Sequence, residues 1–191
     1  QFYYPLNGWE LEYDQDRYPK TCIMYINCYK YAIDLVDNNG ANYNPGDTTC
    51  PYIDSFVRGD GRYNEGYFTF DNIEKMLSFD ADSNNGIMYE EDGNINYGYK
   101  FYKLKNNDEI LEDGMYRIAL FINSTRTDYH FYRQNADGTW SFKDGQLDYY
   151  NYDYSGNIIY DPIFCDRSSY TLPLNENYRF YAVSPCNGSK G

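Results

Sequence analysis

The second half of the chain is dominated by segments that suit the interior of a β-sheet. The eight residues from Met115 to Ile122 carry a single charge and are otherwise apolar or aromatic, which predicts a buried strand. The motif Asn135-Ala-Asp-Gly138 predicts a hairpin turn between two further strands. The predicted strands after the buried one are Tyr129–Gln134, Thr139–Lys143, Ile158–Tyr160 and Tyr178–Val183.

Two helices are predicted before these strands. The first runs from Cys28 to about Asp37, with Asn27 as its N-cap. The second runs from Asp71 to about Phe79, where Asp71 and Glu74 form a variant of the capping box. No repeat or linker interrupts the chain, so we expect one domain over residues 1–191 with an α+β fold.

Tyrosine is the most unusual part of the composition, with 26 residues among 191. The core must therefore be built partly from tyrosine, and some aromatic rings must remain on the surface. The net charge of −13 excludes nucleic acid as a partner, because phosphate binding needs a basic surface, and it argues against an anionic membrane. No apolar run approaches the length of a membrane-spanning helix.

Several features favour an extracellular location. The chain starts at Gln1 without a signal peptide, as a mature or excised protein does. Asn123-Ser-Thr and Asn187-Gly-Ser are glycosylation sequons. Five cysteines leave one thiol over after pairing, and we expect the disulfides Cys22–Cys50 and Cys165–Cys186, with Cys28 free.

Cys28 and His130 are candidate catalytic residues. Cys28 lies in the first turn of a predicted helix, where the helix dipole lowers the pKa of a thiol. His130, the only histidine, lies on a later strand. A cysteine nucleophile needs a base within hydrogen-bond reach, so this order fits a Cys–His dyad. The alternative is that both residues are structural.

Two blocks of sequence resemble a known group of proteins. The segments Asn27-Cys-Tyr-Lys-Tyr-Ala32 and Asp128-Tyr-His-Phe-Tyr-Arg133 are similar to blocks of secreted papain-fold hydrolases of the NlpC/P60 and CHAP type. This resemblance implies a papain-like fold, with N-terminal helices packed on an antiparallel sheet. It also implies a cysteine hydrolase that cleaves a peptide-like substrate at peptide or amide bonds, with no required cofactor. Phe142 departs from the pattern, because it stands about where a polar residue would orient the histidine.

An acidic loop at residues 80–91 has the oxygen spacing of an EF-hand calcium loop. The candidate metal-binding residues of this loop are Asp80, Asp82, Asn84, Gly86 and Glu91. Calcium is therefore a candidate bound ion, although the segment after Glu91 does not look like the exit helix of an EF-hand. The alternative is a solvated acidic loop.

Aromatic residues cluster around and after the predicted hairpin. Tyrosine and tryptophan are frequent contact residues in interfaces, and their rings also stack on sugars. The candidate binding residues are Trp140, Tyr149, Tyr150, Tyr152 and Tyr154. They support a second hypothesis, a monomeric non-catalytic module that binds a protein domain or a glycan. An extracellular scaffold, such as the cohesin-like repeats of fungal cellulosomes, is a setting that suits this composition.

Overall fold

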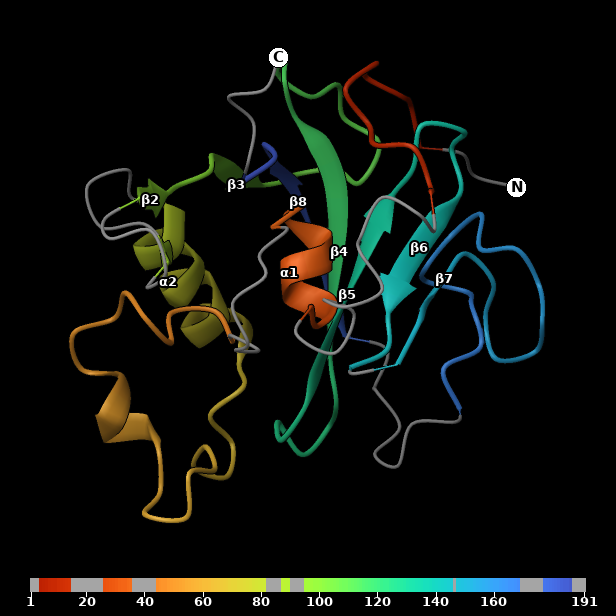
Figure 1. The fold of residues 1–191 in the computed structure, drawn as a ribbon. Helices are drawn as coiled ribbons and strands as arrows, with labels where there is room; N and C mark the ends of the chain where they lie inside the picture. Colours follow the sequence, from red (N-terminus) through yellow and green to blue (C-terminus); the bar gives the residue numbers. More distant parts are fainter. Residues whose placement is uncertain are drawn as a thin grey trace.

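The computed structural model describes residues 4–14, 26–35, 44–81, 87–89, 95–145, 147–168 and 177–186. A six-stranded antiparallel sheet forms the centre of the molecule, in the order β3-β8-β4-β5-β6-β7 (Figure 1). The strands of this sheet are β3 (Phe101–Lys103), β4 (Tyr116–Ile122), β5 (Tyr129–Gln134), β6 (Trp140–Lys143), β7 (Tyr149–Tyr150) and β8 (Tyr178–Val183). A separate pair is formed by β1 (Ile87–Tyr89) and β2 (Ile95–Tyr97).

The strand predicted from the apolar run is observed as β4. Every residue of β4 is buried, because the strand pairs with β5 on one side and β8 on the other. Alternate residues of β4 point to opposite faces of the sheet, as in any strand. Tyr116, Ile118, Leu120 and Ile122 join one hydrophobic cluster, and Ala119 and Phe121 join another. The sheet therefore has a core on each face.

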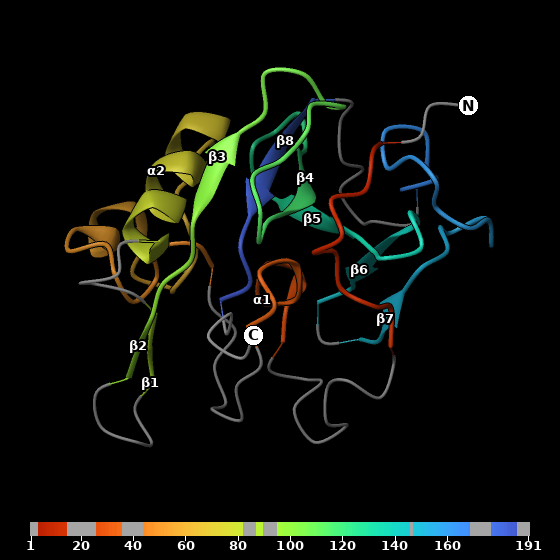
Figure 2. The same cartoon turned by 90° about the horizontal axis from the view of Figure 1, so that it is seen from above.

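Within the described part of the chain, helices cover only one of these two faces. The first cluster contains residues of α1 (Cys28–Ala32) and α2 (Phe70–Ala81), together with Tyr129 and Phe131 of β5. In Figure 1, α1 lies in front of the sheet, and the view from above places α2 beside β3 (Figure 2). The second cluster is closed by irregular segments that contribute Tyr4, Leu104, Leu111 and Ile159.

The predicted papain-like α+β fold is wrong. The described chain is mostly an antiparallel sheet, with two short α-helices and a 3-10 turn, η2 (Ile53–Phe56). The predicted helix from Cys28 to Asp37 ends at Ala32. Asp34 adopts a left-handed φ of 56°, and its buried carboxylate lies 4.0 Å from the guanidinium of Arg133. This tertiary contact accompanies a turn that ends the helix, which helical periodicity does not encode.

Other predicted elements agree more closely. Asn27 caps α1, because its side chain accepts a hydrogen bond from the backbone N–H of Lys30 at 3.0 Å. The second helix is confirmed, but its cap is Thr69, whose hydroxyl accepts from the N–H of Asn72. The strand predicted at Ile158–Tyr160 is reduced to an isolated bridge between Ile158 and Tyr152. None of the helices in the described ranges is long and apolar enough to cross a membrane.

Candidate functional site

Cys28 occupies the first position of α1, as predicted, but its environment does not activate a thiol. The side chain is buried against the sheet in the cluster that contains Phe131. Burial raises the pKa of the Cys28 thiol to about 12, because the thiolate loses its hydration, and a hydrogen bond with the backbone of Phe131 only partly offsets this. At neutral pH the sulfur is therefore protonated.

His130 lies on the opposite face of the sheet. It is adjacent to Phe131 on β5, so the two side chains point to different faces. The ring of His130 packs edge-on against Tyr132 at 4.9 Å and Phe142 at 5.1 Å, and both belong to the second cluster. Burial, with a smaller contribution from the charge of Arg167, lowers the pKa of His130 to about 3. The structure does not bring Cys28 and His130 together.

The expected neighbour of the histidine is observed. Phe142 contacts the His130 ring, at the position where the resemblance to papain-fold hydrolases implies an orienting polar residue. Ser141 points to the other face, where its hydroxyl lies 2.6 Å from that of Tyr31. His130 therefore has an aromatic residue rather than a polar one at this position.

Two of the five predicted binding aromatics are core residues. Trp140 is 0% exposed and packs on Tyr4 and Phe180. Tyr149 is 2% exposed, and its ring stacks on that of Tyr31 at 5.7 Å. Both side chains stabilise the fold and offer no contact area to a ligand.

The other three predicted aromatics share one cleft of about 350 Å³. The ring centroids of Tyr150 and Tyr152 are 5.3 Å apart, and Phe142 lies 5.7 Å from Tyr150 and 6.1 Å from Tyr154. We call this the tyrosine cleft; its lining residues are Phe142, Asp144, Leu147, Tyr150, Tyr152, Asp153, Tyr154 and Gly156. It lies at the β6–β7 end of the sheet.

Hydrogen bonds fix the shape of the tyrosine cleft. The hydroxyl of Tyr154 donates to the carboxylate of Asp144 at 2.6 Å. The carboxylate of Asp153 accepts from the backbone N–H groups of Ser155, Asn157 and Asp166. Leu147 is 61% exposed and Tyr152 is 42% exposed. The lining of this pre-formed cleft therefore presents apolar surface to the solvent.

The predicted calcium loop lies largely outside the described residues. This is true of Asp82, Asn84, Gly86 and Glu91. Asp80 is described, and its buried carboxylate accepts hydrogen bonds from the hydroxyls of Tyr29 and Thr49 and from the N–H of Gly46. Within the described ranges no group of three acidic, histidine or cysteine side chains could hold a metal ion.

The predicted disulfide between Cys165 and Cys186 is absent. Cys186 belongs to the first core cluster and Cys165 packs against the second, so the sheet lies between them. The predicted partner of Cys50, Cys22, lies outside the described residues, as does the sequon at Asn187. The Asn123 side chain is 2% exposed and accepts from the backbone N–H groups of Thr127 and Asp128, so in the folded protein it is not accessible as a glycan acceptor.

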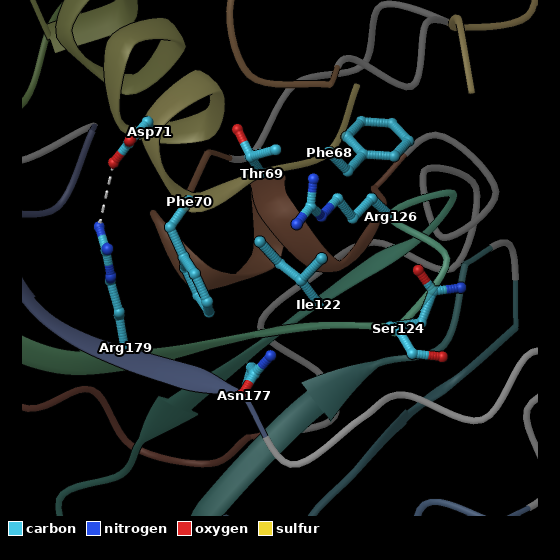
Figure 3. A pocket seen from close by; sticks show the side chains of 10 residues that line it. Phe68, Thr69, Phe70, Asp71, Ile122, Ser124, Arg126, Asn177 and Arg179 are labelled. Carbon is cyan, nitrogen blue, oxygen red and sulfur yellow. Dashed lines mark ion pairs between the residues drawn. The ribbon is translucent and has the colours of Figure 1, made fainter. Parts of the chain in front are cut away.

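A second pocket, which the sequence did not reveal, lies where the β4–β5 turn meets the start of α2 (Figure 3). Its volume is about 620 Å³. It is lined by Phe68, Thr69, Phe70, Asp71, Ile122, Asn123, Ser124, Arg126, Asn177 and Arg179. The sequence signal that could have indicated it is Arg126, a cation in a short polar turn directly after the buried strand.

Comparisons with known proteins place the chain in no established family. No family model matches it. No solved structure matches it. A 44-residue segment is 48% identical to the Insoluble matrix shell protein 1 of Ruditapes philippinarum. That match spans 23% of this chain and 30% of the shell protein.

Proposed function

We propose that this protein is a non-catalytic binding module whose tyrosine cleft holds a partner protein. The observation that carries the proposal is the cleft itself, which is lined by three tyrosines together with an exposed leucine, Leu147. Interfaces are enriched in tyrosine, and their most important contacts are apolar anchors that enter a pocket. The cleft provides such a pocket.

The arrangement gives no support to a cysteine hydrolase built on Cys28 and His130. The sheet separates the two side chains. Burial moves both pKa values away from those that a thiolate nucleophile and a general base require. The binding hypothesis needs neither residue.

The charge of the chain indicates the kind of partner. The net charge is −13, and the carboxylate of Asp144 lies in the wall of the cleft. A partner with lysine or arginine around an aromatic or apolar anchor would complement both the cleft and the surrounding charge. We therefore favour a basic protein segment over a glycan.

An extracellular matrix is the setting that we propose. The partial relative is named as an insoluble matrix shell protein. The acidic, tyrosine-rich composition suits a secreted matrix or scaffold module. The segment shared with the relative is only 44 residues long. The proposed binding function therefore rests on the tyrosine cleft and not on this relative.

The test uses three dye-labelled peptides, Lys-Lys-Trp-Lys-Lys, Glu-Glu-Trp-Glu-Glu and Lys-Lys-Ala-Lys-Lys, titrated with the protein and followed by fluorescence anisotropy. We expect the first to bind, and both the acidic peptide and the alanine peptide to bind at least about tenfold more weakly. Tyr152→Ala should weaken binding of the first peptide about tenfold.

Tyr160→Ala is the matched control. Tyr160 and Tyr152 are each 42% exposed, but Tyr160 does not line the cleft, so its loss should leave the affinity unchanged. Equal binding by wild type and Tyr152→Ala would overturn the proposal. Binding of soluble oligosaccharides that depends on Tyr152, without peptide binding, would replace the protein partner with a sugar.

A further inference from the structure

The pocket between the β4–β5 turn and α2 combines an apolar floor with polar walls. Phe70 from α2 and Ile122 from β4 form the floor (Figure 3). Thr69, Ser124 and Asn177 contribute polar side chains to the lining. A volume of about 620 Å³ is in the range of pockets that hold small ligands. No residue of this pocket belongs to the tyrosine cleft.

The two arginines of the pocket differ in their charge balance. The guanidinium of Arg179 lies 2.6 Å from the carboxylate of Glu74 and 3.6 Å from that of Asp71, over the ring of Phe70. These carboxylates balance its charge. Arg126 has no acidic side chain within ion-pair distance among the residues that the structure describes. Figure 3 shows its side chain extending over Ile122 toward Thr69.

The backbone holds Arg126 in a fixed and strained position. Its φ of 56° is left-handed, which side chains with a Cβ rarely adopt. Its N–H donates to the carbonyl of Asn123 at 3.0 Å, and its carbonyl accepts from the N–H of Phe68 at 3.2 Å. Strain of this kind is concentrated at functional positions, where surrounding contacts maintain it.

We propose that this pocket binds a carboxylate attached to an aromatic body. The guanidinium of Arg126 would pair with the carboxylate, since arginine presents two parallel donors that match its geometry. The aromatic body would pack on Phe70 and Ile122. An anion is the ligand that complements a cation with no acidic partner among the described residues, and the Arg126 guanidinium would attract one locally in a chain whose net charge is −13. This inference is independent of the function proposed for the tyrosine cleft.

The carboxylate has two sources, a free aromatic acid or the C-terminal residue of a peptide. The test measures binding of 3-phenylpropionate and of N-acetyl-Gly-Gly-Phe by calorimetry, with acetate and the amide N-acetyl-Gly-Gly-Phe-NH2 as comparisons. We expect at least one of the two aromatic acids to bind. Acetate and the neutral amide should each bind at least about tenfold more weakly, because one lacks the ring and the other lacks the charge. Tighter binding of the tripeptide acid would identify a chain terminus as the ligand.

Arg126→Gln should weaken binding of the preferred acid at least about tenfold, whereas Arg62→Gln, which removes an exposed arginine that does not line the pocket, should not. Arg126→Gly removes the same charge and also relieves the left-handed strain, so it gives a well-folded second variant. Equal affinity of acid and amide, or unchanged binding in both Arg126 variants, would overturn the proposal. Tyr152→Ala should leave this binding intact, which separates the result from a failure of the tyrosine cleft.

Discussion

At the scale of single residues, burial decides the chemistry of the two candidate catalytic groups. A thiol at a helix N-terminus is expected to have a lowered pKa. In Cys28 the loss of hydration dominates instead, in a helix of only five residues. The lone histidine likewise packs between aromatic rings, where its neutral form is favoured. Both residues therefore behave as core side chains.

Cys28 should not react with iodoacetamide in the native protein. With a pKa of about 12, only about one thiol in ten thousand or fewer is ionised near neutral pH, and the side chain is buried. Peptide mapping after labelling at pH 7.5 should show Cys28 modified only when denaturant is added. Rapid native labelling that His130→Ala abolishes would contradict this prediction and restore the dyad.

His130 should remain neutral from pH 8 to pH 5. Because it is the only histidine, one imidazole signal in an NMR titration reports it directly, and that signal should not shift over this range. The folded pKa of about 3 lies below the ordinary value of 6.5, so its contribution to stability is complete above pH 6.5 and is lost as the pH falls. The loss at pH 5 should be about 2 kcal/mol.

The variant His130→Phe isolates this effect. Asp80 shifts stability in the opposite direction, because its folded pKa is raised to about 6 by burial and protonation therefore favours the folded state. The informative quantity is thus the difference between wild type and variant in denaturant unfolding at pH 8 and pH 5. Phenylalanine should remove about 2 kcal/mol of acid sensitivity, and identical pH profiles would show that His130 is not buried as a neutral ring.

At the scale of elements, one carboxylate joins three segments of the helical layer. Asp80 on α2 accepts from Tyr29 of α1 and from Gly46 and Thr49 of the segment before η2. The hydroxyl of Tyr29 also lies 2.7 Å from that of Tyr99. This network makes Asp80 a structural residue of the helix rather than a free oxygen ligand at the start of the acidic loop.

Asp80→Ala should destabilise the protein by about 3–5 kcal/mol, because it leaves several buried donors without an acceptor. Asp71→Ala on the same helix is the control, since the Asp71 side chain is 90% exposed and its loss should change stability by less than about 0.5 kcal/mol. Urea unfolding monitored by circular dichroism measures both. Similar small effects for the two variants would show that the network does not stabilise the fold.

The helices and strands also show where the local sequence was sufficient to predict secondary structure and where it was not. The helix predicted from Asp71 to about Phe79 is observed as α2, because its apolar spacing agrees with its buried face, which contains Ile73, Met76 and Leu77. The first helix was overpredicted because Asp34 leaves helical geometry next to Arg133, a residue about one hundred positions later in the chain. The short strands β3 and β7 carry too few residues for any periodic pattern, and they depend on pairing with β8 and β6.

At the scale of the whole molecule, the sequence by itself determined that tyrosine must enter the core, that the surface is acidic, and that a buried strand lies at residues 115–122. These properties follow from composition and local pattern. Only the tertiary structure decided that Cys28 and His130 face different cores, that Trp140 is buried while Tyr152 lines a cleft, and that Arg126 stands over a pocket. The physical reason is that the face of a sheet on which a side chain lies depends on strand register, which is set by contacts between distant segments.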